Sequence, residues 1–255
     1  MRKLNITGLL IVLWLAACAA LHAEVLLVAD EFPAMEALAR KLKAAAQIDS
    51  RIIAQDALPA DLQPFSAVVV YLHFKLTEKA ELAFIDYTRR GGKLVVLHHS
   101  ISSLKRGNRE WFSFLGVSLP EGGLEANGYK WIEKVDLELV NLAPDHFITT
   151  HAVQYPGKIQ YTRENSSSAA ALPGVELKDT EVYLNHVLTR PKTILLGVKY
   201  SHAKNGKTYL QDRAGWLEPA GKGMLIYLQS GHSSRDFDNP VYGQIVANAI
   251  AWQPK

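Results

Sequence analysis

The chain has 255 residues and nearly balanced charges, with 28 Lys and Arg against 25 Asp and Glu. No basic cluster interleaved with aromatic residues is present, so we expect no nucleic-acid partner. The only cysteine, Cys18, lies in an N-terminal targeting pattern, which leaves the rest of the chain without a disulfide, a thiolate nucleophile or a cysteine metal ligand.

Residues 1–23 have the pattern of a secretory signal peptide: a basic start, the apolar stretch Leu9–Leu15, and small residues up to Ala23. The apolar stretch is too short to span a membrane comfortably. Two processing routes stay open. Cleavage after Ala23 would release a periplasmic or secreted domain of residues 24–255, whereas a Leu-Ala-Ala-Cys sequence that resembles a bacterial lipobox would place a lipid on Cys18. We therefore expect an exported protein that meets the membrane only through this segment or that lipid.

Beyond residue 24, short apolar runs typical of buried parallel strands alternate with amphipathic helices. We expect strands at 25–29, 51–54, 67–72 and 93–97, and helices at 33–47 and 78–90. This alternation indicates βαβ units and a parallel sheet.

The pattern changes after about residue 116. Glycine-rich turns and the alternating stretch Val135–Leu139 indicate half-exposed antiparallel β structure inserted into the parallel core. The low-complexity segment Ser166–Ala171 predicts a loop. Asn205-Gly206 predicts the turn of a hairpin formed by residues 193–200 and 208–211.

The chain ends with a strand and a helix that frame a histidine. Met224–Leu228 reads as a buried strand, Gly231 permits a tight turn, and Asp238 or Asn239 caps the following helix. Ligands of open α/β sheets bind outside the carboxyl ends of the strands. His232 lies there, so it is a candidate site residue, although it could instead satisfy backbone groups of the turn.

A second group of polar residues, His98-His99-Ser100, follows the strand at 93–97. Because parallel strands end on a common edge, at least one of these histidines should approach His232. Ser100 could serve as a nucleophile, but the G-x-S-x-G pattern is absent, so no strained nucleophile elbow is expected. Alternatively, the histidines order a neighbouring loop and Ser100 caps a turn.

Four segments resemble the ThuA-like (trehalose utilisation) family and together span most of residues 24–252. They are Gly91–Ser100, Asp145–Thr149, Asp179–Tyr183 and Gly221–Trp252. The resemblance implies a flavodoxin-like, doubly wound, mainly parallel sheet with β-rich insertions, similar to class I glutamine amidotransferases. It also implies a link to carbohydrate use. The chain departs from the family pattern at Phe147, where proline is usual, and at the interposed Thr180.

In the amidotransferase-like fold, the turn after the strand at 93–97 would carry a nucleophilic cysteine, which is missing here, so the Cys-dependent mechanism is excluded. The family pattern places Glu181 in the cleft, and we expect His98, Glu181 and His232 to be catalytic. Alternatively, Glu181 is a solvated carboxylate on a loop. The expected substrate-binding residues are His99, Ser100, His146, Tyr183 and Trp131. For His146 the ordering of a loop comes first and ligand contact second, and for Trp131 a position in the core or at an interface is the alternative.

Histidine and carboxylate side chains also suit zinc or a similar ion. No local ligand motif such as H-E-x-x-H is present, so no metal ligand is assigned, although a divalent ion at His98, Glu181 and His232 stays open. The resulting hypothesis is an exported ThuA-like protein that acts on a small carbohydrate or keto-sugar by His/Glu acid–base chemistry, as a hydrolase, lyase or isomerase. The alternative is a non-catalytic carbohydrate-binding or scaffold module.

Overall fold

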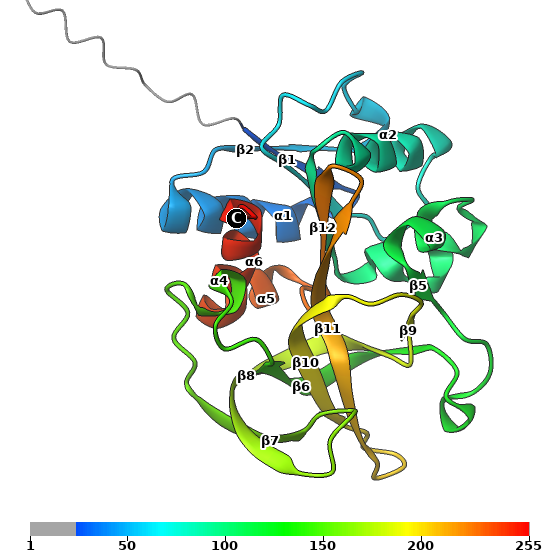
Figure 1. Ribbon diagram of the computed structural model, residues 1–255, viewed down its shortest axis with the longest axis vertical. Coiled ribbons are helices and arrows are strands. Elements are labelled where there is room, and N and C mark those ends of the chain that lie inside the picture. Colours follow the sequence, from blue (N-terminus) through cyan, green and yellow to red (C-terminus); the bar gives the residue numbers. More distant parts are fainter. Residues whose placement is uncertain (1–23, 255) are drawn as a thin grey trace, which may run out of the picture.

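The computed structural model describes residues 24–254, and its main element is a ten-stranded sheet with the order β2-β1-β3-β4-β12-β11-β10-β6-β8-β7 (Figure 1). The first five strands are parallel, and every later neighbour pairs antiparallel. The parallel strands are β1 (Val25–Ala29), β2 (Ser50–Ile53), β3 (Ala67–Tyr71), β4 (Lys93–Leu97) and β12 (Gly223–Leu228). The antiparallel strands are β6 (Lys130–Asn141), β7 (Gly157–Thr162), β8 (Ala169–Leu184), β10 (Thr193–Ser201) and β11 (Thr208–Ala220).

The parallel half has the flavodoxin-like strand order 2-1-3-4-5, with β12 as the fifth strand. The predicted doubly wound architecture is therefore confirmed, as is the adjacency of β1, β3, β4 and β12. Helices α1 (Phe32–Ala46) and α6 (Pro240–Ala251) cover one face, and α2 (Glu78–Arg89) covers the other.

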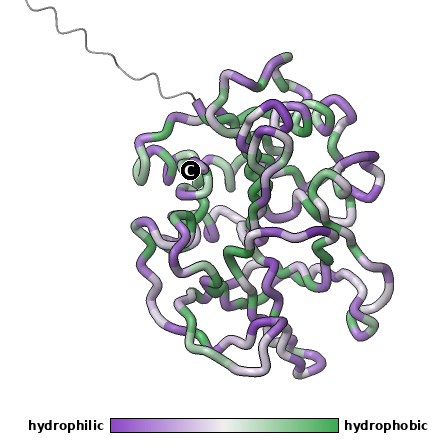
Figure 2. The backbone as a smooth tube through the Cα atoms, in the orientation of Figure 1, coloured by the Kyte–Doolittle hydropathy of each residue, from purple (hydrophilic) through white to green (hydrophobic). Residues whose placement is uncertain are grey.

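Alternation along each central strand divides its side chains between two cores. Leu27 and Val69 pack on the α1/α6 side, whereas Leu26 and Val68 pack on the α2 side, and all four are fully buried. Such strands have no polar face, which explains their continuous apolar runs. Figure 2 shows hydrophobic segments through the centre of the sheet and hydrophilic segments in many of the outer loops.

Capping residues fix where two of the helices begin. The Thr77 hydroxyl accepts a hydrogen bond from the Ala80 N–H at the start of α2. The Asn239 side chain accepts from the N–H groups of Val241 and Tyr242 at the start of α6, directly after the short helix α5 (Ser234–Asp238). These bonds satisfy N–H groups that have no partner within the helix.

The antiparallel half contains the predicted hairpin, with Gly206 in the left-handed region (φ +67°) between β10 and β11. The prediction of a loop over the whole of residues 166–171 was wrong. Ala169–Ala171 belong to β8 and pair with Gln160–Thr162 of β7. Pairing with the neighbouring strand, which a single segment does not reveal, decides the conformation of these alanines.

The remaining elements are short. They are α3 (Trp111–Leu115), α4 (Phe147–Thr150), and a two-stranded sheet of β5 (Val117–Ser118) and β9 (Val187–Leu188). Between residues 24 and 254, no helix has the length and apolarity needed to cross a bilayer. The predicted signal segment, including Cys18, lies outside the described residues, so its processing stays a prediction.

Candidate functional site

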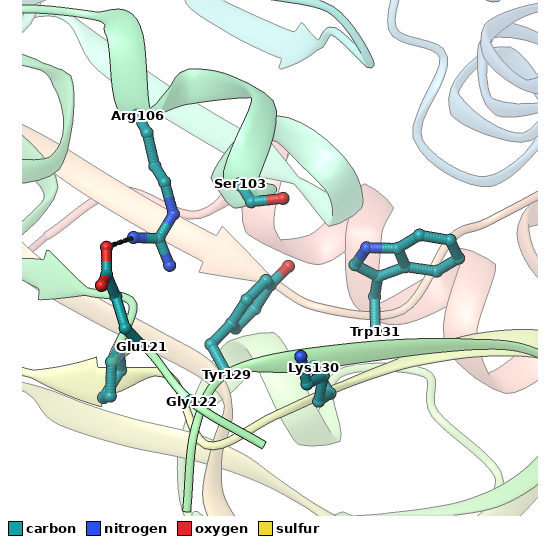
Figure 3. Close-up of a pocket in the computed structure, with 8 residues that line it drawn as sticks. Ser103, Arg106, Glu121, Gly122, Tyr129, Lys130 and Trp131 are labelled. Atoms are coloured by element: carbon teal, nitrogen blue, oxygen red, sulfur yellow. Dashed lines mark hydrogen bonds and ion pairs between the residues drawn. The ribbon is translucent and has the colours of Figure 1, made fainter. Parts of the chain in front are cut away.

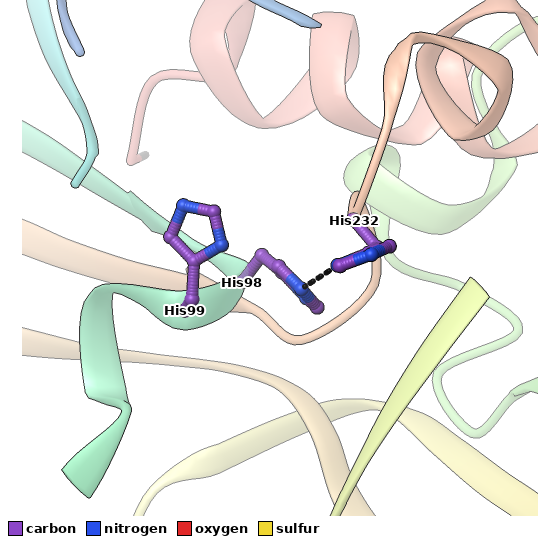
Figure 4. Close-up of side chains that lie close together, drawn as sticks. All are labelled: His98, His99 and His232. Carbon is purple, nitrogen blue, oxygen red and sulfur yellow. Dashed lines mark hydrogen bonds between the residues drawn. The ribbon is translucent and has the colours of Figure 1, made fainter. Parts of the chain in front are cut away.

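Three side chains from distant parts of the chain meet at the carboxyl edge of the parallel strands. His98 follows β4, His232 follows β12, and Glu181 lies in β8. Glu181 Oε2 is 2.7 Å from His98 Nε2 and 3.3 Å from His232 Nδ1, and these two nitrogens are 3.2 Å apart. Figure 4 shows the His98 ring turned toward His232. We call these three residues the His–Glu cluster; the structure thus brings together the side chains that the sequence nominated.

His98 occupies a strained turn. Its φ of +46° lies in the left-handed region, which costs a non-glycine residue roughly 1–2 kcal/mol. The strain is at His98 and not at Ser100, so the structure has no serine elbow here, and the strained histidine was not predicted. The ring is fully buried and stacks on Tyr183, with centroids 5.0 Å apart.

The orientation of the His98 ring follows from its hydrogen bonds. Its Nδ1 lies 2.7 Å from the Gln229 carbonyl oxygen, which can only accept, so Nδ1 carries a hydrogen. Its Nε2 therefore faces Glu181. The backbone of β12 thus fixes which nitrogen of His98 meets the carboxylate.

Glu181 is a buried carboxylate held between two imidazoles, with its side chain 7% exposed. Burial alone raises the pKa of a carboxyl group, but hydrogen bonds from His232 and His98 outweigh it and lower the pKa of Glu181 to about 2. Glu181 is therefore ionised at neutral pH despite its burial.

Irregular pairing between β6 and β8 lies next to Glu181. Glu133 is its partner on β6, and the register then shifts at Lys134 and again near Asp179, both of which have positive φ. Bulges increase local twist and redirect side chains, and they are frequent beside active sites. This irregularity explains how a strand of the insertion directs Glu181 at residues of the parallel core.

His232 is the accessible member of the cluster, with its side chain 33% exposed. The hydrogen bond to Glu181 raises its pKa above the usual 6.5, while partial burial opposes the rise. Among residues 24–254, its Nε2 makes no hydrogen bond to protein, so this nitrogen is available to a ligand.

Asp236, which the sequence analysis did not single out, positions the cluster. Its buried Oδ2 accepts hydrogen bonds from the N–H groups of Gly231 (3.2 Å) and His232 (2.7 Å) and from the Thr180 hydroxyl (2.6 Å). One carboxylate oxygen therefore ties the His232 turn to the residue beside Glu181. The signal in the sequence was a carboxylate four residues after a histidine in a turn, a spacing too common to interpret alone.

A cavity of about 260 Å³ reaches the cluster at Glu181, and we call it the cleft cavity. His232 lines a neighbouring cavity, together with Glu31 and Phe32. The residues that line the cleft cavity are His73, Ser102, Ser103, Leu104, Trp131, Glu133, Glu181 and Tyr183. Trp131 is 51% exposed and pairs across the strands with Tyr183, so two of the expected binding residues line this space.

Ser103 and Trp131 also line an adjacent cavity of about 330 Å³. Figure 3 shows Trp131 at one end of this space and the ion pair of Arg106 with Glu121 at the other. The exposed indole of Trp131 thus contributes to both cavities.

The other three expected binding residues, His99, Ser100 and His146, do not line the cleft cavity. Ser100 is fully buried, and its hydroxyl donates to the Val70 carbonyl and accepts from the Leu72 N–H, which places it in the core against β3. His146 caps α4 by accepting from the Ile148 N–H, and its ring packs on Trp252. The binding role of Ser100 is corrected, because the sequence places a residue near a strand end without showing which way its side chain turns. For His146, the capping bond agrees with the loop-ordering role and not with ligand contact.

The position of His146 shows that it lies away from the cluster. The Trp252 carbonyl accepts a hydrogen bond from Lys93, the first residue of β4, whereas His98 follows the last residue of that strand. His146 therefore lies toward the amino end of the strands. His146 is therefore a helix-capping residue of the insertion.

His99 and Lys105 are buried beside the cluster. Lys105 Nζ donates to the carbonyl groups of Leu72, His73 and His99, and burial lowers its pKa to about 7. Its donors are therefore occupied by the backbone. His99 forms two groups with ligand atoms within 4.8 Å of one another: one with His98 and His232, and one with Glu31 and His73.

Known proteins share this fold. A structure from Bacteroides uniformis ATCC 8492 described as ThuA-like superimposes with a TM-score of 0.60 at 15% identity, covering 92% of this chain and 93% of that one. A β-galactosidase from Rahnella sp. R3 (TM-score 0.50, 13% identity) and the carbohydrate deacetylase Agd3 (0.51, 12%) match 88% of this chain. This chain spans only 31% and 32% of those two longer chains.

No curated protein matches the chain significantly by sequence. The sequence profile described as trehalose utilisation, ThuA, does match, and it extends over residues 24–253. The chain therefore belongs to the trehalose utilisation (ThuA) family.

Proposed function

We propose that the protein acts on a small carbohydrate or keto-sugar, with Glu181 and His232 as the proton-transfer pair. The observation that carries the proposal is an ionised carboxylate, buried between two imidazoles at the wall of a cavity. Perturbed ionisable groups that meet in a cavity are typical of catalytic sites. The family's link to carbohydrate use supports the substrate class.

Each member of the cluster has a distinct role in this proposal. His232 has a raised pKa and an accessible Nε2, so it would give a proton to, or take one from, a sugar hydroxyl or carbonyl oxygen. Glu181 would stabilise the protonated form of His232. His98, locked by the Gln229 carbonyl and fully buried, would hold Glu181 in place.

Exposed apolar side chains around the cavity support a sugar as the ligand. Leu104 and Trp131 line the cleft cavity, Phe32 lines a neighbouring cavity with His232, and Phe74 contacts the His73 ring. All four are at least 40% exposed. Aromatic faces stack on the apolar faces of sugar rings, and Trp131 is the largest of them.

The test is an incubation of the purified protein with a panel of disaccharides and keto-disaccharides, with products separated by chromatography. We expect turnover by the wild type and its loss in His232→Ala, with thermal stability changed by no more than about 2 kcal/mol because the side chain is partly exposed. His151→Ala, an exposed histidine stacked on Phe147, is the matched control and should keep full activity. Saccharide binding without turnover would contradict an enzymatic role and support a non-catalytic carbohydrate-binding module.

We also propose that the protein is exported, on the signal pattern of residues 1–23. Intact-mass analysis of the protein made in a secreting bacterium tests this. A chain starting at Glu24 indicates a soluble product, and an acylated Cys18 indicates a lipid-anchored one. Retention of Met1 in the exported fraction contradicts both.

A further inference from the structure

His99 is buried without a hydrogen-bond partner. Its side chain is 1% exposed, and neither ring nitrogen has a hydrogen bond to any group in residues 24–254. An unsatisfied buried polar group costs roughly 1–3 kcal/mol, so each such group calls for an explanation. Burial, followed by the nearby charges of His98 and Lys105, also lowers the pKa of His99, so the ring is neutral and offers a lone pair.

Two exposed side chains stand next to His99. His73 Nδ1 lies 3.7 Å from Glu31 Oε1, too far for a hydrogen bond, and the His73 and His99 ring centroids are 4.9 Å apart. One ligand atom from each of Glu31, His73 and His99 lies within 4.8 Å of the other two. We call these three residues the rim trio.

The three residues of the rim trio occupy the same position relative to three neighbouring strands. Glu31, His73 and His99 are each the second residue after the end of β1, β3 and β4, respectively, and these strands are neighbours in the parallel sheet. The three side chains therefore start from equivalent positions on adjacent strands. This is the edge where ligands of doubly wound sheets bind.

The backbone around the rim trio is fixed. The Asp30 carboxylate accepts from the N–H groups of His73 (2.7 Å) and Phe74 (2.9 Å). Lys105 donates to the carbonyl groups of both His73 and His99. Outer contacts of this kind orient metal ligands, and the charge of Lys105 is offset by Asp30 and Glu31, which face it.

We propose that Glu31, His73 and His99 form a binding site for a divalent transition-metal ion of the zinc type. Two histidines and one glutamate are a common zinc set that leaves an open position for water or a ligand. Zinc bonds of about 2.0–2.2 Å place tetrahedral ligands roughly 3.3 Å apart. The ligand atoms of the rim trio lie within 4.8 Å of one another, so the exposed Glu31 and His73 side chains must close in by at most about 1.5 Å. Their exposure leaves them free to rotate.

The other trio that contains His99 is the weaker alternative. In that trio, His98 Nδ1 is bonded to the Gln229 carbonyl and His98 Nε2 to the Glu181 carboxylate. The Nδ1 of His232 also faces Glu181. In the rim trio, neither imidazole makes a side-chain hydrogen bond to residues 24–254. The rim trio adjoins two cavities, since His73 lines the cleft cavity with Glu181, and Glu31 lines the neighbouring cavity with His232.

Isothermal titration of the purified, metal-stripped protein with Zn²⁺ at pH 7 tests the site. We expect one ion per chain, with affinity lowered at least tenfold in His73→Ala and in Glu31→Gln. Both residues are exposed, so both variants should fold. His151→Ala controls for adventitious binding by a surface histidine and should bind like the wild type.

His232→Ala distinguishes the two trios and should keep the wild-type zinc affinity. Absence of stoichiometric binding overturns the inference, and so does a loss of affinity in His232→Ala as large as in His73→Ala. The site does not depend on the proposed function. Zinc binding without turnover of any saccharide supports the metal site and contradicts the proposed enzymatic function. Turnover without zinc binding contradicts only the metal site.

Discussion

Replacement of Glu181 by glutamine should remove a large, pH-dependent part of the folding free energy. Glutamine keeps the shape of the side chain and one acceptor oxygen but removes the charge, so it resembles the protonated carboxyl group. The pKa of Glu181 falls from 4.5 to about 2 in the folded protein. At 1.36 kcal/mol per unit, this corresponds to ~3 kcal/mol of stability at neutral pH.

The sign of the pH dependence follows from the lowered pKa. The contribution is fully present above pH 4.5, where the unfolded chain is also ionised, and it is lost as the pH falls toward 2. The wild type should therefore exceed Glu181→Gln in stability by ~3 kcal/mol at pH 7 and by only about 1 kcal/mol at pH 3.

Urea denaturation followed by circular dichroism at pH 7, 5, 4 and 3 measures this difference. Glu133→Gln is the matched control, because Glu133 is the exposed cross-strand partner of Glu181 and should change stability by less than about 0.5 kcal/mol. Equal stability of wild type and Glu181→Gln at pH 7, or a difference that stays constant down to pH 3, would show that the Glu181 charge does not stabilise the fold.

Three further predictions concern the surroundings of the cluster. Ser100→Ala removes the hydrogen bonds to the Val70 carbonyl of β3 and the Leu72 N–H just after it, and should cost about 1–3 kcal/mol in urea denaturation without changing saccharide affinity. Weaker binding at full stability contradicts this. Gly231→Ala should cost more stability than Gly206→Ala, because both have positive φ but only at position 231 does a Cβ meet a ring, at 2.8 Å. By NMR titration, His232 should have a pKa above 6.5 that falls in Glu181→Gln, and its stabilising contribution should fade as the pH rises through that pKa; a wild-type value below 6.5 contradicts the geometry.

The parallel half of the fold was predictable because each central strand is buried on both faces and so carries a continuous apolar run. The positions of His98 and His232 followed, since His98 comes directly after β4 and His232 lies four residues after the end of β12. The placement of Glu181 relied on family resemblance, because the bulges that direct it depend on pairing between β6 and β8.

The orientation of Ser100 and the rim trio could not be predicted from the sequence, because both depend on tertiary structure. Whether Ser100 faces the cleft or β3 depends on the turn geometry set by His98. No local sequence motif predicts the positive φ of His98. The rim trio was missed because its members are far apart in sequence, and only the order of β1, β3 and β4 brings them together.

Saccharide binding at the His–Glu cluster can be tested directly, because the chain has nine histidines that report on different regions. The imidazole signals, assigned by single substitutions, are followed by NMR while a saccharide from the panel is added. We expect saturable shifts at His98 and His232, with His146 and His151 unchanged as internal controls. Saturable binding that shifts His146, which lines a separate cavity with Trp252, and leaves His232 unchanged would contradict binding at the cluster.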